Sequence, residues 1–129
     1  MFTLEQIKQA HDKVQTGADF PNYIQDLINL GVKGYDTLIN YGRVAYYDSN
    51  DDSVSTDKKY DEIKIASTAN KERFIEFLVM NQDGQTDYFT FCQQAAQSGI
   101  AKSRIDIIEM TCTYFDAVGD AIVIEKIPS

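Results

Sequence analysis

The chain has 129 residues, 43% of them hydrophobic, and its 20 acidic and 12 basic residues give a net charge of −8. A chain of this length can bury roughly two thirds of its unfolded surface in a single core. The negative charge argues against a nucleic-acid partner, because such binding depends on clustered Lys and Arg that neutralise phosphates. We therefore expect one domain, residues 1–129, with no nucleic-acid partner.

The first residues are polar and charged, where a signal peptide would need an apolar run. No stretch approaches the ~20 apolar residues of a membrane span. The two cysteines fit neither a disulfide framework nor a zinc pattern. These features predict a cytoplasmic protein with reduced thiols and no membrane partner.

Two amphipathic helices are expected at the start of the chain. Thr3 has the position of an N-cap, with Gln6 at the capping-box spacing, and this helix is predicted to end near Gly17. Asp19 is predicted to cap the second helix, and Gly31 to end it as a left-handed glycine. Their apolar stripes are Leu4, Ile7, Ala10, His11 and Val14, then Phe20, Tyr23, Ile24 and Leu27.

The pattern then changes to a period of two residues, which is typical of strands. We expect strands over 35–41 and 43–48, around Val54 and over 60–65. The second half has the same order. Helices are predicted from Asn70 (or Thr68) to Asp83 and from Asp87 (or Thr86) to Gly99, followed by strands at 105–110, 111–116 and 121–127.

The two halves resemble each other in sequence. A shift of 68 residues places 19–55 over 87–123 without a gap, and a shift of 67 best aligns the first helix of each half. Chance would leave roughly two identical pairs. The seven identical pairs observed are Asp19/Asp87, Gln25/Gln93, Gly31/Gly99, Ile39/Ile107, Tyr46/Tyr114, Asp48/Asp116 and Asp52/Asp120.

This repeat predicts an α+β fold made by a tandem ααβββ duplication, with pseudo-repeats of about 1–66 and 67–129. Short connections between neighbouring strands require antiparallel pairing, with the helices packed on the sheet. A half of this size is marginal alone, so we expect the two halves to share one core about a pseudo-two-fold axis.

The repeat also provides a test for catalytic candidates, because each can be compared with its equivalent. The single histidine and both cysteines have aliphatic equivalents. This favours a position at the edge of the core for the histidine and inside the core for the cysteines, rather than catalysis or metal binding. We expect both thiols to be buried, unpaired and dispensable. The pairs are His11/Leu78, Cys92/Ile24 and Cys112/Val44.

The segment 48–52, Asp-Ser-Asn-Asp-Asp, resembles the start of a calcium-binding loop. The sixth position is Ser53 where glycine is needed, and the twelfth is Lys59 where a glutamate is needed. The equivalent stretch, 116–120, keeps only its outer aspartates. We therefore favour a tight turn over calcium, and predict no metal and no cofactor.

One group of repeated residues is a candidate ligand site. Tyr46 and Asp48, and likewise Tyr114 and Asp116, lie two residues apart and therefore project from the same face of a strand. If the axis runs near these strands, the four side chains could line a shared cleft for a cationic or hydroxyl-rich ligand. The alternative, which we favour, is that the tyrosines pack on the sheet and the aspartates end the strands.

Four motifs taken together, MFTLEQIKQAH, GADFPNYIQDLINLGV, TDYFTFC and MTCTYFD, resemble a small bacterial domain family of unknown function that often carries the label "phage envelope protein". The resemblance covers essentially the whole chain. It implies no established activity, cofactor or catalytic residue, and it suggests a phage or prophage origin.

Three functions follow as hypotheses. We expect a non-enzymatic binding or regulatory protein, because every catalytic candidate has an apolar equivalent or an incomplete set of partners. The alternative is a small-molecule enzyme or ligand-binding protein that uses a cleft between the halves. A structural or assembly protein of a phage comes third.

Overall fold

The computed structural model of the chain describes residues 2–14 and 19–127. It has the predicted α+β class, and within the described residues it contains four helices and a six-stranded antiparallel sheet. The predicted end of the first helix near Gly17 lies outside the described residues. The elements are α1 (Leu4–His11), α2 (Phe20–Leu30), β1 (Gly34–Leu38), β2 (Arg43–Tyr47), β3 (Ser53–Ser55), α3 (Lys71–Gln82), α4 (Tyr88–Gln97), β4 (Ile100–Asp106), β5 (Thr111–Asp116) and β6 (Ala121–Lys126).

The helices begin where the sequence predicts. Thr3 and Gln6 form the complete capping box, with the Thr3 N–H donating to Gln6 Oε1 at 2.8 Å and the Gln6 N–H donating to Thr3 Oγ1 at 3.2 Å. Asn70 and Asp87 each accept a hydrogen bond from the backbone N–H three residues later, at 3.1 and 2.8 Å. Asp19 is the N-cap residue of α2, as predicted, although its side chain makes no capping hydrogen bond. The capping bonds of Thr3, Asn70 and Asp87 satisfy N–H groups that the first turn of a helix leaves unpaired.

The sheet has the strand order β3-β2-β1-β4-β5-β6, in which the second half mirrors the first. At its centre β1 and β4 pair with Asp36 opposite Arg104, two residues that are equivalent under the 68-residue shift. The Arg104 Nε and Nη2 atoms donate to the two Asp36 carboxylate oxygens at 2.8 and 3.0 Å. This register is the one that a two-fold axis between the two strands would produce.

Residues with a left-handed backbone also fall at equivalent positions in the two halves. Glycine tolerates this conformation because it has no Cβ, whereas other residues rarely adopt it. The equivalent pairs are Gly31 (φ 91°) and Gly99 (φ 83°), Gly42 (φ 72°) and Met110 (φ 55°), and Asp51 (φ 63°) and Gly119 (φ 93°). Such matches are what the two-unit prediction requires, although the duplication itself stays a prediction.

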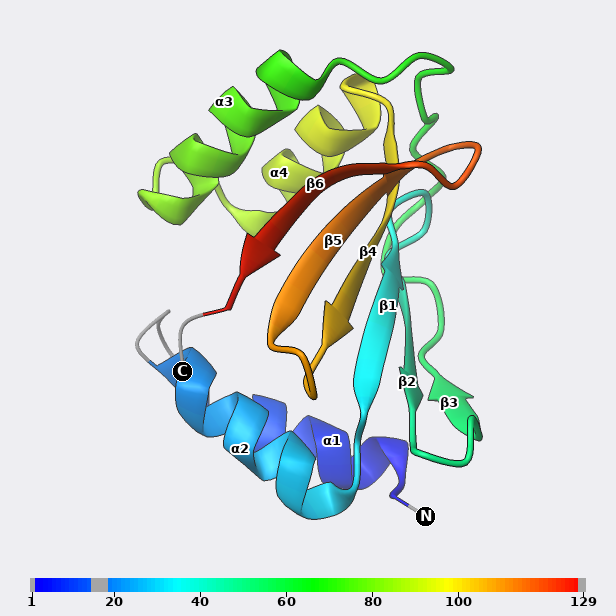
Figure 1. Ribbon diagram of the computed structural model, residues 1–129, viewed down its shortest axis with the longest axis vertical. Coiled ribbons are helices and arrows are strands. Elements are labelled where there is room, and N and C mark those ends of the chain that lie inside the picture. Colours follow the sequence, from blue (N-terminus) through cyan, green and yellow to red (C-terminus); the bar gives the residue numbers. More distant parts are fainter. Residues whose placement is uncertain (1, 15–18, 128–129) are drawn as a thin grey trace.

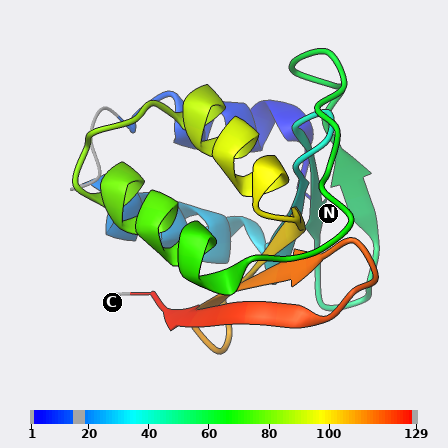
Figure 2. The same ribbon diagram turned by 90° about the horizontal axis from the view of Figure 1, so that it is seen from above.

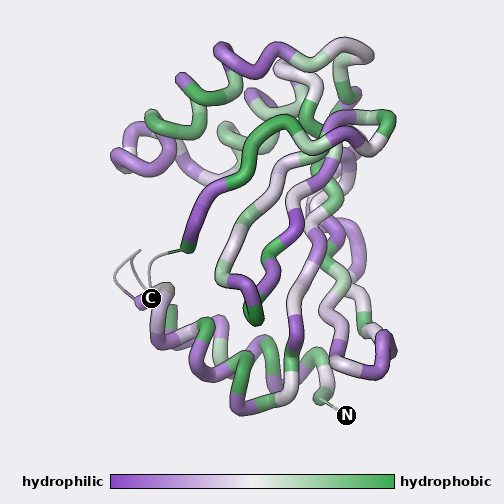
Figure 3. Tube along the Cα trace, viewed as in Figure 1, coloured by the Kyte–Doolittle hydropathy of each residue, from purple (hydrophilic) through white to green (hydrophobic). Residues whose placement is uncertain are grey.

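The helices form two pairs, α1 with α2 and α3 with α4, near opposite ends of the sheet (Figure 1). Seen from above, both pairs lie on the same side of the sheet, which curves around them (Figure 2). Helical and strand residues of both halves contribute to one buried hydrophobic cluster, with Leu27, Phe74 and Ile100 among its fully buried members. Along the helices, hydrophobic and hydrophilic residues interleave as expected for elements with one buried face (Figure 3).

Three predicted strands differ from the structure: one is absent, and two have other limits. The segment 60–65 contains no strand, and instead hydrogen bonds to the turn after β1, with the Ile63 N–H donating to the Asn40 oxygen at 2.8 Å. The strand expected over 35–41 ends at Leu38, and the one expected over 105–110 runs from Ile100 to Asp106. Each of these two strands ends in a tight turn, at 39–42 and 107–110, whose alternating side chains imitate a strand in the sequence.

Candidate functional site

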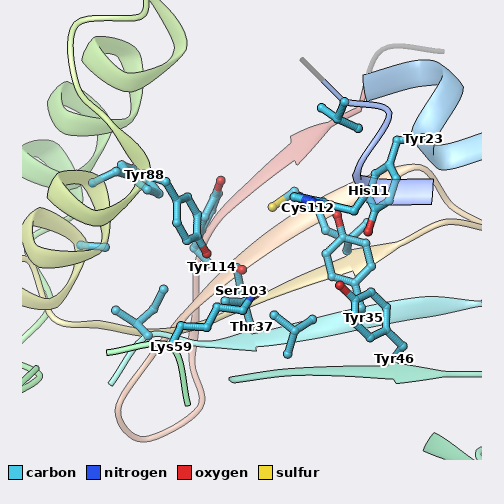
Figure 4. A pocket seen from close by; sticks show the side chains of 16 residues that line it. His11, Tyr23, Tyr35, Thr37, Tyr46, Lys59, Tyr88, Ser103, Cys112 and Tyr114 are labelled. Atoms are coloured by element: carbon cyan, nitrogen blue, oxygen red, sulfur yellow. The ribbon is translucent and has the colours of Figure 1, made fainter. Parts of the chain in front are cut away.

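A cleft of about 310 Å³ lies over the middle of the sheet, between the two helix pairs. We call it the central cleft. Its floor comes from the inner faces of β1, β2, β4 and β5, and its walls from α1, α2 and α4 (Figure 4). Its lining residues are His11, Val14, Tyr23, Tyr35, Thr37, Ile39, Val44, Tyr46, Lys59, Tyr88, Phe91, Ala95, Ser103, Ile105, Cys112 and Tyr114.

The predicted site residues Tyr46 and Tyr114 both line the central cleft. They lie on the inner faces of β2 and β5, where alternation along the strand turns every second side chain towards the helices. Tyr46 belongs to a cluster in the first half. It shares a hydrogen bond with the Tyr23 hydroxyl, and its ring centroid lies 5.2 Å from that of Tyr35.

Tyr114 has different neighbours. Its ring packs edge-on against Phe74 with the centroids 4.8 Å apart, and its hydroxyl lies 3.5 Å from Glu125 Oε1. Phe74 is fully buried and also contacts Phe91 at 5.9 Å between centroids. The tyrosine of the second half is therefore held mainly by aromatic packing, whereas Tyr46 is held by a hydroxyl contact as well.

The tyrosine hydroxyls of the cleft are neutral at physiological pH. Burial raises the pKa of all five, Tyr23, Tyr35, Tyr46, Tyr88 and Tyr114, above the ordinary value of 10.0. A neutral phenol can both donate and accept a hydrogen bond. The cleft thus presents aromatic faces together with hydroxyls that suit either kind of polar partner.

Asp48 and Asp116 lie outside the central cleft. Asp48 is in the turn that follows β2, and Asp116 is the last residue of β5. Asp48 Oδ1 accepts from the backbone N–H groups of residues 50 and 52, at 2.8 and 3.2 Å. Asp116 Oδ1 accepts from those of residues 118 and 120, at 3.1 and 2.8 Å. The structure therefore does not bring these two aspartates together with the two tyrosines, because their carboxylates close the turns.

Both cysteines are buried and neither forms a disulfide, as predicted. Burial raises the pKa of the Cys112 thiol to about 11, against a smaller lowering by its hydrogen bond with Tyr114. Burial likewise raises the pKa of Cys92, although hydrogen bonds with the Tyr60 and Tyr88 hydroxyls oppose the increase. Neither thiol has the lowered pKa that an activated nucleophile needs.

The mouth of the cleft carries its basic side chains, His11 and Lys59, both of which are exposed. The His11 ring packs edge-on against Tyr23 at 5.5 Å between centroids. The backbone N–H of Lys59 donates to the Tyr41 oxygen at 2.8 Å, which attaches this segment to the turn after β1. His11, predicted to lie at the edge of the core, is therefore a residue of the cleft mouth.

Sequence reasoning did not select Tyr35, Thr37, Ser103, Tyr88 or Lys59, all of which line the cleft. Tyr35 could have been found, because it is the direct cross-strand partner of Tyr46. Ser103 faces Thr37 across the pair of central strands and follows from that register. Lys59 lies in an irregular segment, where no periodicity indicates the direction of a side chain.

Within residues 2–14 and 19–127, no group of three or more His, Cys, Asp or Glu side chains could hold a metal ion. No helix in that part of the chain has the length and apolar character to cross a bilayer.

The sequence matches the family described as "Protein of unknown function (DUF1398)" over residues 8–126. A search of curated protein sequences gives no significant match. The family description assigns neither ligand nor reaction, so the chemistry of the central cleft is the available guide to function.

Proposed function

The chain belongs to the DUF1398 family, whose description assigns no activity, and we propose that it is a non-enzymatic protein that binds a small molecule in the central cleft. The single observation that carries this proposal is the composition of the cleft. Both halves contribute to it, and it combines five tyrosines with aliphatic side chains such as Val44 and Ile105. Mostly apolar concave sites with a few polar groups are typical of small-molecule pockets, and this volume is at the small end of their range.

The same residues favour binding over catalysis. No Asp or Glu is among the described lining residues, so the cleft lacks a carboxylate for general acid–base work. Cys112 lines the cleft, but its raised pKa keeps it a thiol at neutral pH. A small-molecule enzyme remains the second hypothesis, for which Tyr46 and Tyr114 are the first residues to replace.

A regulatory role would follow if ligand binding changed the position of one helix pair relative to the other, since the cleft lies between them. The location in the cytoplasm and the phage origin stay predictions, because the first rests on composition and the second on the family resemblance.

A thermal-shift screen of the full chain against a metabolite library tests the proposal. A ligand at a hundred times its Kd stabilises the folded state by about 2.7 kcal/mol. We expect at least one stabilising compound whose effect falls in Tyr46→Phe and Tyr114→Phe, because these substitutions remove hydroxyls from the cleft with little change in volume.

The matched control is Tyr47→Phe. Tyr47 follows Tyr46 on the same strand and is absent from the cleft lining, because successive side chains point to opposite faces of the sheet. A stabilising compound whose effect falls equally in Tyr47→Phe would bind elsewhere. A screen without stabilising compounds, together with tight capture of a protein partner, would contradict small-molecule binding and favour a protein that acts by binding another protein.

A further inference from the structure

The charge around the central cleft is opposite in sign to the net charge of the chain. The chain has a net charge of −8, yet the described lining of the cleft contains one lysine, Lys59, and no acidic residue. A shallow pocket beside the mouth shares His11, Tyr46 and Lys59 with the cleft and adds Lys8, again without an acidic residue in its described lining. Two lysines and a histidine therefore line the cleft and its neighbouring pocket.

This basic group occurs in one half of the molecule. At the 67-residue shift, Lys8 and His11 of α1 correspond to Ile75 and Leu78 of α3. Ile75 is partly exposed and Leu78 is buried, so the fold does not require a basic residue at either position. The wall from α1 is thus basic, whereas the wall from α4 consists of the apolar and neutral side chains of Phe91, Ala95 and Tyr88.

Lys59 enters the cleft from the side of α4, opposite α1, where the ring of the neighbouring Tyr60 packs against Phe89 with the centroids 5.2 Å apart (Figure 4). The Lys59 N–H donates to the Tyr41 oxygen at 2.8 Å. The next residue, Tyr60, donates its hydroxyl to the Ile39 oxygen at 2.6 Å. Both contacts attach the segment to the turn after β1, which fixes where the ammonium group can reach.

We propose that the ligand is a small organic acid with an aromatic or otherwise apolar body, whose carboxylate lies at the mouth near Lys59, Lys8 and His11. The inference rests on the proposed function and adds the ligand class. The apolar body fits among Val44, Ile105 and Phe91, where burial supplies most of the affinity. An exposed lysine pair contributes little affinity but discriminates between charges.

The experiment uses the full chain and three probes of nearly equal shape: 1-naphthoate, 1-naphthamide and 1-naphthylmethylammonium. Calorimetry or quenching of tyrosine fluorescence gives each Kd. We expect the carboxylate to bind about fivefold more tightly than the amide, the size of one exposed ion pair, and the ammonium ion to bind most weakly. The preference should shrink in 1 M salt, where the screening length falls to about 3 Å.

Lys59→Gln should remove most of the preference for the carboxylate while leaving the Kd of the amide unchanged. Lys64→Gln, an exposed lysine of the same segment that lines neither pocket, is the matched control and should keep the preference. Lys8→Gln should have a smaller effect than Lys59→Gln, since Lys8 lines only the outer pocket.

The outcomes distinguish an error in the ligand class from an error in the binding function. If cleft ligands exist but the amide or the ammonium probe binds as tightly as the carboxylate, the ligand class is wrong and the binding function stands. If neither the probes nor the library compounds bind in a way that depends on Tyr46 or Tyr114, both proposals fall.

Discussion

The two halves of the molecule each place a left-handed glycine after their second helix, but the surroundings of the two glycines differ. A Cβ added at Gly31 would meet no atom within 4 Å. A Cβ added at Gly99 would lie 2.6 Å from the Ala69 Cα and 2.6 Å from the Thr68 oxygen. At Gly31, only the reversal of the chain favours glycine. At Gly99, a neighbouring backbone segment also leaves no room for a Cβ.

The neighbouring backbone is the segment that leads from the first half into α3. It is attached to the end of α4 by two hydrogen bonds, from the Asn70 N–H to the Ser98 oxygen and from the Ala66 N–H to the Ala96 oxygen, each 2.9 Å. Among the described residues, none approaches Gly31 in this way. Equivalent positions can therefore carry the same residue under unequal constraints.

Replacing each glycine by alanine should make this inequality measurable. Gly31→Ala should cost about 1–2 kcal/mol, the strain of a left-handed residue with a Cβ. Gly99→Ala should cost about 2–5 kcal/mol, because displacement of the backbone at 68–69 adds an overpacking penalty of about 1–3 kcal/mol. Urea denaturation, with the m-value checked for constancy, gives both free energies of unfolding. Equal losses would show that the close contact at Gly99 relaxes without cost.

The two cysteines allow the buried positions of the two halves to be compared. Cys92→Val and Cys112→Val should each cost less than ~1.5 kcal/mol, since Ile24 and Val44 fill the equivalent positions and are buried. Alkylation of the folded protein at pH 8 should be slow. With a pKa of about 11, roughly one Cys112 in a thousand is a thiolate at that pH. Rapid stoichiometric labelling of either cysteine would contradict burial and favour the enzyme hypothesis.

The tyrosine pair should give the smallest difference. Tyr46→Phe removes a hydrogen bond with Tyr23 and should cost about 1 kcal/mol. Tyr114→Phe should cost about 0.5 kcal/mol or less, because its hydroxyl has only a 3.5 Å contact with Glu125, near the limit of a hydrogen bond, and a weak thiol partner. The same denaturation measurement applies, and a larger loss for Tyr114→Phe would reverse our description of the two environments.

The helix ends could be predicted from sequence because capping is local: Thr3, Asn70 and Asp87 act on the N–H group three residues away. The strand limits could not, because the turns at 39–42 and 107–110 continue the alternation of the strands before them. Met110 gives no sequence signal for its left-handed backbone, and only its equivalent, Gly42, points to a turn there.

The candidate site was partly predictable for a similar reason. Comparison of the halves selects what they share, which is Tyr46 and Tyr114. It passes over what makes the cleft asymmetric, such as Lys59 and the serine–tyrosine difference between positions 103 and 35. The aspartates close turns, in line with the alternative that we favoured, because one residue type suits both a ligand and a turn and the local backbone N–H groups lie within reach of the carboxylates.

The Asp36–Arg104 pair at the centre of the sheet has a consequence for how copies of the chain could recognise one another. Across a two-fold axis between identical strands, a residue at this position would face its own copy, and like charges directly opposite each other destabilise a sheet. Aspartate faces arginine here only because the two halves differ. The pair therefore favours a first half joined to a second half, within one chain or by exchange between two. It disfavours assemblies in which two first halves or two second halves meet along this central seam.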